Sequence, residues 1–299
     1  HIYSRISNPT VQVLEERVAA LEGGTAALAT ASGMSAIFLA IMTLCNTGDH
    51  VVVSSQLYGG TVNLFRLTLP KFGIKATFVK PRDTEGFKKA IQENTKCIFG
   101  ELVGNPGNEL MNMPEIVKIA NEAGIPVIID STYQTPYLFK PLEHGADIVV
   151  HSLTKWFGGH GAGIGGIVVD SGRFDWSAGK HPLFDEPDTS YHGLRWGHDL
   201  PDMLAPLAYI LRMRTVPLRN LGACISPDNS WLFLQGIETL PLRMERHCTN
   251  SKLVAEHLSA HDSVEWVRFP GLESDPEFDK NLSLIHISEP TRLRRISYA

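Results

Sequence analysis

Short apolar segments recur along the first 170 residues and alternate with longer segments of helical period. The short segments are apolar at both alternating positions, which is typical of strands that are covered on both faces. We therefore predict strands at residues 51–55, 75–80, 97–102, 126–130, 147–152 and 164–170.

Three segments between these strands, residues 61–73, 84–95 and 113–124, carry apolar residues at the i, i+3/i+4, i+7 spacing of an amphipathic helix. Another helix is predicted within residues 29–42, where Ser32-Gly33-Met34 precedes a strongly apolar run. A repeated strand–helix–strand order predicts an α/β fold, with a mostly parallel sheet and helices on both of its faces.

The pattern changes near residue 229, where a long amphipathic stretch begins that is interrupted at Pro241. A strand-like run follows at residues 264–269, so we expect the beginning of an incomplete α+β C-terminal domain. Residues 282–299 open with "LSLIHISEPTR", which a transposase sequencing adapter read in frame can encode, and we expect this tail to be non-native. The expected organisation is an N-terminal arm remnant (1–7), a cofactor-binding domain (8–228), an incomplete domain (229–281) and the tail (282–299).

The amino-acid composition of the chain limits the classes of binding partner that we expect. The chain is 43% hydrophobic and 20% charged, with a net charge of −5. Since no run of Lys or Arg occurs, we expect no nucleic-acid partner. The apolar runs are too short to span a bilayer, so we expect no membrane partner. The four cysteines lack a C-x-x-C spacing and are typical of reduced thiols, which indicates a cytoplasmic enzyme.

Ligands of parallel α/β sheets bind beyond the carboxyl ends of the strands. The polar residues that end the predicted strands are therefore the candidates for a site: Ser54, Ser55, Glu101, Asp130, His151 and Ser152. Lys155 follows the last of these strands and lies in a glycine-rich loop with room for a ligand.

The same loop contains a G-x-G-x-x-G motif at Gly161, Gly163 and Gly166. A dinucleotide site requires such glycines to follow a strand directly and to open a helix. Here the predicted strand 164–170 comes next, so the context excludes a nicotinamide site. No metal site is predicted either, because His144, His151 and His160 lack a metal-ligand spacing.

Asp130 ends a fully apolar strand, where a carboxylate is costly unless a cation or a turn meets it. A salt bridge or a helix cap is one explanation. The other is pyridoxal phosphate, which requires a lysine for its Schiff base and an acid facing its ring nitrogen. Lys155 and Asp130 fit these two roles.

The phosphate of that cofactor needs hydrogen-bond donors. Backbone N–H groups at the start of the helix, at Gly33 and Met34, suit an anion. Ser152 and Thr154 add hydroxyls near Lys155, and Tyr58 could stack on a flat ring, although a lone Tyr in a turn is more often a packing residue.

Several motifs resemble the Cys/Met-metabolism family of pyridoxal-phosphate enzymes, which has the aspartate-aminotransferase-like fold (PLP fold type I). They are "YSRISNPT" (3–10), "LYGGT" (57–61), "GNP" (104–106), residues 130–161 and "LQGIETLPLRMERH" (234–247), and the resemblance covers residues 1–281. It implies that Lys155 is the Schiff-base residue and that Asp130 meets the pyridine nitrogen. It further implies roles for Tyr58 (ring stacking and proton transfer), Gly33, Met34, Ser152 and Thr154 (phosphate), Asn105 (ring hydroxyl), and Tyr3 with Arg5, which would reach a neighbouring subunit's phosphate site in a homodimer or homotetramer.

Residues 170–194 form a long polar and aromatic insertion whose sequence resembles that of the O-acetylhomoserine sulfhydrylase branch of that family. The implied reaction replaces the acetoxy group of O-acetyl-L-homoserine by sulfide or a thiol, in methionine and cysteine biosynthesis. A methionine γ-lyase, a cystathionine γ-synthase and an inactive cofactor-binding fragment remain alternatives. No arginine within residues 230–281 matches the family's substrate-carboxylate motif, so none is assigned.

Overall fold

The computed structural model describes residues 3–275 and residue 278. Its centre is a seven-stranded sheet with the strand order β1-β7-β6-β5-β4-β2-β3. The expected non-native tail, residues 282–299, lies outside the described residues. The strands are β1 (Ala26–Thr30), β2 (His50–Ser54), β3 (Lys75–Val79), β4 (Thr95–Glu101), β5 (Val127–Asp130), β6 (Ile148–Ser152) and β7 (Gly166–Asp170).

The sheet is mostly parallel, as the sequence predicts. Strands β3, β2, β4, β5 and β6 pair in parallel in that order, whereas β7 is antiparallel to both β6 and β1. All six predicted strands of this sheet are present, and β1 is an additional one. The strand-like run at residues 264–269 was wrongly predicted, because the structure has no strand there and the sheet does not include this segment.

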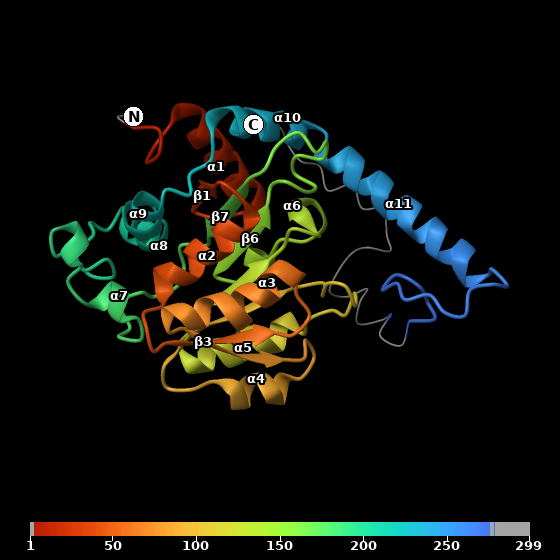
Figure 1. Ribbon diagram of the computed structural model, residues 1–299, viewed down its shortest axis with the longest axis horizontal. Coiled ribbons are helices and arrows are strands. Elements are labelled where there is room, and N and C mark those ends of the chain that lie inside the picture. Colours follow the sequence, from red (N-terminus) through yellow and green to blue (C-terminus); the bar gives the residue numbers. More distant parts are fainter. Residues whose placement is uncertain (1–2, 276–277, 279–299) are drawn as a thin grey trace.

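Alternate residues of each strand face two separate apolar layers, which explains why the strands are apolar at both parities. On one face Val52, Ile98 and Val149 pack with helices α1, α5 and α10. On the other face Val51 and Phe99 belong to the layer that contains α2 and α8. Helices therefore cover both faces, as predicted (Figure 1).

The helices begin and end mostly where sequence signals place them. Asn8 caps α1 and Ser32 caps α2, each by accepting backbone N–H groups of the first turn. The helices are α1 (Pro9–Glu22), α2 (Gly33–Leu44), α3 (Gly59–Asn63), α4 (Thr84–Ala90), α5 (Met113–Ala123), α6 (Thr135–Leu138), α7 (Pro182–Asp185), α8 (Ala208–Met213), α9 (Arg219–Leu221), α10 (Pro227–Glu238) and α11 (Leu240–Ser259).

Two predicted helices differ from the observed ones. The segment 61–73 is divided into α3, a π-helical stretch (Leu64–Thr68) and a 3-10 turn (Leu69–Phe72). Pro70 lies in this segment and has no N–H to continue an α-helix. Helix α4 ends at Ala90, earlier than the predicted residue 95, because Thr95 already belongs to β4.

The amphipathic stretch near the end of the described chain forms two helices that meet at Thr239. Helix α10 packs against α1, while α11 extends away from the body of the molecule (Figure 1). Pro241 stands in the first turn of α11, where a missing N–H costs nothing. No helix among the described residues has the length and apolar character needed to cross a membrane.

The insertion at residues 170–194 leaves the sheet at the edge opposite to Asp130 and Ser152, since Asp170 pairs with Ile148 at the start of β6. It is anchored at the start of β4, where the His181 ring donates to the Lys96 carbonyl (2.9 Å). Burial lowers the pKa of His181 to about 4, so this ring is neutral at pH 7.

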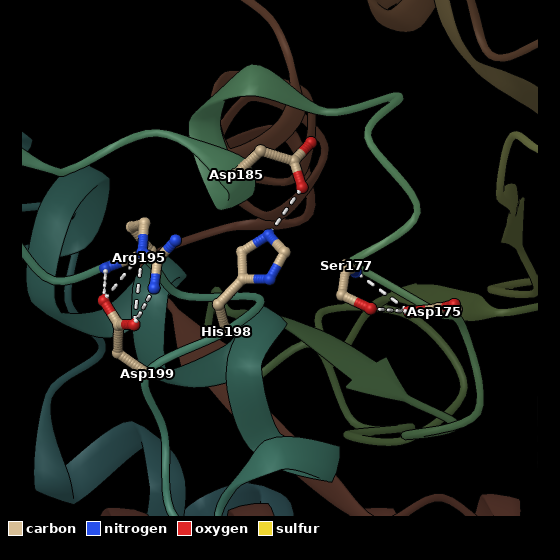
Figure 2. A network of polar contacts seen from close by, with 6 residues as sticks. All are labelled: Asp175, Ser177, Asp185, Arg195, His198 and Asp199. Atoms are coloured by element: carbon tan, nitrogen blue, oxygen red, sulfur yellow. Dashed lines mark hydrogen bonds and ion pairs between the residues drawn. The ribbon is translucent and has the colours of Figure 1, made fainter.

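The insertion and the residues after it also carry a surface network of polar contacts (Figure 2). His198 Nε2 lies 2.9 Å from Asp185 Oδ1. Arg195 forms an ion pair with Asp199 through both Nε and Nη2, and the shortest distance is 2.7 Å, between Nη2 and Oδ1. These bonds join residues of one segment to each other. We therefore assign them to the segment's own structure.

Candidate active site

The carboxyl edge of the sheet gathers the residues that the sequence singles out. Asp130 ends β5 and lies in register with Glu101, the last residue of β4. On its other side is Val150 of β6, two residues before Ser152. Because these strands are parallel, their polar ends meet at one edge, as expected for a ligand site.

Thr132 connects two of these strand ends. Its backbone N–H donates to Asp130 Oδ1 (3.0 Å), and its hydroxyl accepts the backbone N–H of Ser152 (2.7 Å). The turn after β5 thus fixes Asp130 relative to β6. The local turn that we considered as an alternative role of Asp130 is present, whereas no ion pair to Asp130 occurs among the described residues.

The two neighbouring carboxyl groups have raised pKa values. Burial, followed by the charge of Asp130, raises the pKa of Glu101 to about 8 against the lowering effect of the Tyr58 N–H. Burial also raises the pKa of Asp130, although hydrogen bonds from Thr132 and the charge of His151 lower it. A cation placed beside this pair would stabilise both carboxylates.

The start of α2 lies directly against Ser152. A Cβ at Gly33 would be 2.6 Å from the Ser152 Cβ, so only glycine permits this approach. Ser32 Oγ caps the Ser35 N–H, and the N–H groups of Gly33 and Met34 have no acceptor within the helix. The combination of free N–H groups, a helix N-terminus and a serine hydroxyl is suited to a phosphate.

Gly166 has a related role at the start of β7. A Cβ there would lie 2.2 Å from the Ser32 carbonyl oxygen, so this glycine lets β7 pass beneath the start of α2. A strand follows the glycines instead of a helix, which agrees with our rejection of a nicotinamide site. Among the described residues, no group of three or more His, Cys, Asp or Glu side chains could hold a metal ion.

Lys155 lies in a turn that follows β6, and its side chain is exposed. The turn is closed by hydrogen bonds from Gly158 N–H to the Leu153 carbonyl (2.9 Å) and from Gly159 N–H to the Lys155 carbonyl (2.8 Å). Within the described part of the chain, the Lys155 ammonium forms no ion pair. Its amine is therefore available to a ligand.

Thr154, which we expected to donate to a phosphate, forms hydrogen bonds to Gly165 in this structure. Its hydroxyl lies 3.2 Å from the Gly165 carbonyl and accepts the Gly165 N–H at 3.1 Å. The single hydroxyl proton bonds to the Gly165 carbonyl here, so donation to a phosphate would require this bond to open. Thr154 thus closes the glycine-rich loop, and its role towards a phosphate stays a prediction.

Tyr58 lies next to the start of α2. Its backbone N–H donates to Glu101 Oε1 (2.7 Å), and its ring is half exposed. A Cβ at Gly60 would meet Tyr58 Cε1 at 2.6 Å and Met34 Sδ at 3.4 Å, so the Tyr58 ring and the Met34 side chain both lie close to this glycine. The half-exposed ring is free to cover a ligand at the carboxyl edge.

The loop that carries Asn105 follows β4 and packs on the segment before Tyr58. Gln56 contacts Gly104 and Gly107 so closely that a Cβ at either glycine would lie within 2.7 Å of its side chain. Gln56 also donates to Glu109 (2.5 Å). Asn105 itself is exposed, so its loop reaches the neighbourhood of the site through Gln56.

Tyr3 and Arg5 do not join these residues within one chain. The Arg5 guanidinium lies 5.0 Å over the Tyr3 ring and donates to the Arg219 carbonyl near α9. Tyr3 is exposed. The structure gives no contact between this pair and the phosphate-binding residues proposed above, so the expectation that they serve a neighbouring subunit stays a prediction.

The sequence did not assign roles to Glu101 and Thr132. Glu101 carried a usable signal, because it ends a buried strand as Asp130 does, and an isolated carboxylate there also needs a partner. Thr132 carried no such signal, since a hydroxyl in a turn is common. Only the pairing of β5 with β6 shows that it bonds to both strand ends.

The mostly parallel sheet carries three features at one edge: a helix N-terminus suited to a phosphate, an exposed lysine and a half-buried carboxylate. These are the features expected of pyridoxal-phosphate enzymes of fold type I. The model of the Cys/Met metabolism PLP-dependent enzyme family matches residues 1–286. The chain belongs to this family.

Relatives and solved structures agree with this assignment. The chain is 52% identical over 282 residues to the O-acetyl-L-homoserine sulfhydrylase of Leptospira meyeri, covering 93% of this chain and 64% of that protein. It is 48% identical over 277 residues to the homocysteine synthase of Schizosaccharomyces pombe, covering 92% and 64%.

A crystal structure of a putative O-acetylhomoserine (thiol)-lyase from Campylobacter jejuni superposes with a TM-score of 0.91 at 38% identity, covering 97% of this chain and 71% of that one. It contains an N′-pyridoxyl-lysine-5′-monophosphate residue. The chain spans 64% of the length of the two curated relatives, so the activity of the whole protein is taken up below as a proposal.

Proposed function

We propose that the chain carries the cofactor site of an enzyme that converts O-acetyl-L-homoserine and sulfide, or a thiol, into L-homocysteine, or a thioether, and acetate. The observation that carries the proposal is the arrangement of Lys155, Asp130 and the start of α2 at one sheet edge. The similarity to sulfhydrylases and homocysteine synthases supports this reaction over the lyase and cystathionine synthase alternatives.

The residues present fit pyridoxal phosphate. The N–H groups of Gly33 and Met34 would hold the phosphate with Ser152, while Asp130 would face the ring nitrogen and Tyr58 would stack on the ring. When bound, this cofactor supplies an electron sink that stabilises negative charge at Cα and Cβ of an amino acid. The raised pKa of Asp130 supports its pairing with a protonated nitrogen, since a positive charge there would keep the carboxylate ionised.

Lys155 would hold the cofactor between turnovers and act as the base during them. Its exposed amine would take a proton from Cα, pass it to the bound cofactor, and then take a second proton from Cβ as acetate leaves from Cγ. Asp130 would keep the ring nitrogen of the bound cofactor protonated, and Tyr58 would orient the departing group or carry a proton. Sulfide then adds at Cγ, and the protons return.

Asn105 would contact the ring hydroxyl, and Thr154 would add a donor to the phosphate. Tyr3 and Arg5 would complete the phosphate site of a second subunit in a homodimer or homotetramer. We place the protein in the cytoplasm and in methionine and cysteine biosynthesis, which agrees with the four unpaired cysteines.

The test is a product analysis of the purified chain with pyridoxal phosphate, O-acetyl-L-homoserine and sulfide. We expect homocysteine and acetate in equal amounts. The turnover rate of Lys155→Ala should be lower than that of the wild type by at least about a thousandfold. Release of 2-oxobutanoate as the main product would instead identify a γ-lyase, and turnover only with cysteine would identify a cystathionine synthase. Cofactor binding without any turnover would identify an inactive cofactor-binding chain.

A further inference from the structure

Arg243, the fourth residue of α11, forms hydrogen bonds both to the turn that carries Lys155 and to the end of α10. Its Nη1 donates to the Trp156 carbonyl (2.6 Å), and its Nη2 donates to the carbonyls of Phe157 (3.3 Å) and Gly236 (2.8 Å). Its Nε donates to Thr239 Oγ1 (3.1 Å). One side chain thus joins the break between α10 and α11 to the two residues that follow Lys155.

The turn is shaped to receive this guanidinium. Gly159 has a φ of +70°, and a Cβ there would lie 2.3 Å from Arg243 Cζ. On the other side, a Cβ at Gly236 would lie 2.4 Å from the Phe157 carbonyl oxygen. Two glycines therefore provide the space in which the guanidinium meets the turn, and a side chain at either position would separate α10 and α11 from it.

The chemistry of the contact requires arginine. No carboxylate forms an ion pair with Arg243 among the described residues, and burial lowers its pKa. Four of its contacts go to neutral oxygens, three of them backbone carbonyls in different directions. The planar fork of a guanidinium can satisfy these acceptors together, whereas a lysine ammonium cannot span them.

We propose that Arg243 is a positioning residue for the reactive lysine: its guanidinium holds the turn 153–159 in the shape that presents Lys155 at the carboxyl edge of the sheet. The proposal rests on the proposed function in that Lys155 is taken as the reactive amine. Four of its five N–H donors are already used, so we assign Arg243 to the support of this turn and not to the substrate carboxylate. It transmits the position of α11 to Lys155.

Arg243→Lys tests the proposal, with Arg246→Lys as the matched control on the exposed side of the same helix. In the protein without cofactor, hydrogen exchange of the Gly158 and Gly159 amides should accelerate about tenfold or more in Arg243→Lys, because charged hydrogen bonds that close the turn are lost. Arg246→Lys should exchange at the wild-type rate. Equal protection in Arg243→Lys and the wild type would overturn the proposal.

The second readout uses the visible absorbance of the lysine-bound cofactor. Arg243→Lys should bind pyridoxal phosphate about tenfold more weakly, and the pH at which its band changes should shift, since the amine is less well oriented. Thr239→Val removes the Nε acceptor together with a long hydroxyl bond to the Gly236 carbonyl (3.4 Å) and leaves the two bonds from Arg243 to the turn in place. It should show both effects more weakly and keeps the test open if Arg243→Lys does not fold. An unchanged exchange rate and band in Thr239→Val would then contradict the proposal.

The two proposals fail in different ways. If the wild type forms no lysine-bound band, the proposed function is wrong, yet the exchange measurement still reports on Arg243 and the turn. If the wild type forms the band and the Arg243 and Thr239 variants match it in exchange, affinity and pH response, the function stands and the positioning role is wrong.

Discussion

At the scale of single residues, the site depends on two carboxyl groups that end adjacent strands. Glu101 and Asp130 lie in register, and burial raises the pKa of both. Without a cation beside them, at least one keeps its proton over much of the neutral range. A bound pyridinium would supply that cation, so charge in the site should change when the cofactor binds.

Replacement of Glu101 gives a test of this electrostatic arrangement. The folded protein holds a proton on Glu101 up to about pH 8, while the unfolded chain releases it near pH 4.5. The free energy of unfolding therefore falls as pH rises through this window. Glu101→Gln keeps an acceptor for the Tyr58 N–H and should make the fall between pH 5.5 and pH 8 shallower by about 1–2 kcal/mol.

The measurement is urea unfolding of the protein without cofactor at a series of pH values. Glu122→Gln, on the exposed side of α5, is the control and should follow the wild-type slope. A Glu101→Gln profile parallel to that of the wild type would show that Glu101 is ionised in the folded protein throughout this range.

Site residues could be predicted from the sequence where a charged side chain interrupted or followed an apolar strand. Asp130 stood out because an acid ended an apolar strand, and Lys155 because it followed the next strand into a glycine-rich loop. Thr132 and Arg243 could not be found this way. Their roles depend on which backbone groups lie opposite them, and that is set by the pairing of strands and the packing of helices distant in sequence.

At the scale of elements, the proposed phosphate site depends on how closely α2 approaches β6 and β7. Gly33 contacts Ser152, and Gly166 contacts the Ser32 carbonyl. Both contacts involve atoms that cannot rotate away easily. The position of the α2 N-terminus is therefore fixed by two glycines, one in the helix and one in the strand beneath it.

Gly166→Ala tests this arrangement. Its Cβ would lie 2.2 Å from a backbone oxygen, so α2 or β7 must shift, and we expect a loss of about 1–3 kcal/mol in unfolding free energy. Pyridoxal phosphate should also bind more weakly, because the Gly33 and Met34 N–H groups move. Gly59→Ala is the stability control, since nothing lies within 4 Å of its added Cβ. Thermal unfolding and cofactor titration measure both effects, and a Gly166→Ala protein as stable as Gly59→Ala would contradict the account.

Helices and strands were predicted correctly where the apolar residues followed one clear period along the sequence. The six strands with apolar residues at both alternating positions were recognised, and the predicted segment 113–124 contains the whole of α5. Strand β1 was missed because three of the five residues of "AALAT" are alanines, which have a weak strand preference, and its pairing with β7 supplies the stability. The run at 264–269 has a strand pattern, but isolated strand propensity forms no strand without a partner.

At the scale of the whole molecule, the carboxyl edge of the sheet and the opposite edge carry different features. The carboxyl edge carries Lys155, Asp130 and the start of α2, whereas the insertion at residues 170–194 is anchored at the opposite edge through His181 and Lys96. The insertion is therefore anchored at the edge of the sheet that lies opposite to the proposed site. Sequence alone could not establish this, because its position follows from the antiparallel direction of β7.

The central claim is that Lys155 bonds to the cofactor, and borohydride reduction tests it most directly. The chain is loaded with pyridoxal phosphate, reduced, digested and examined by mass spectrometry for a lysine that carries the pyridoxyl group. We predict that the label lies on the peptide containing Lys155 and that Lys155→Ala carries none. A label on another lysine, or no label in a protein that shows the visible band, would contradict the account.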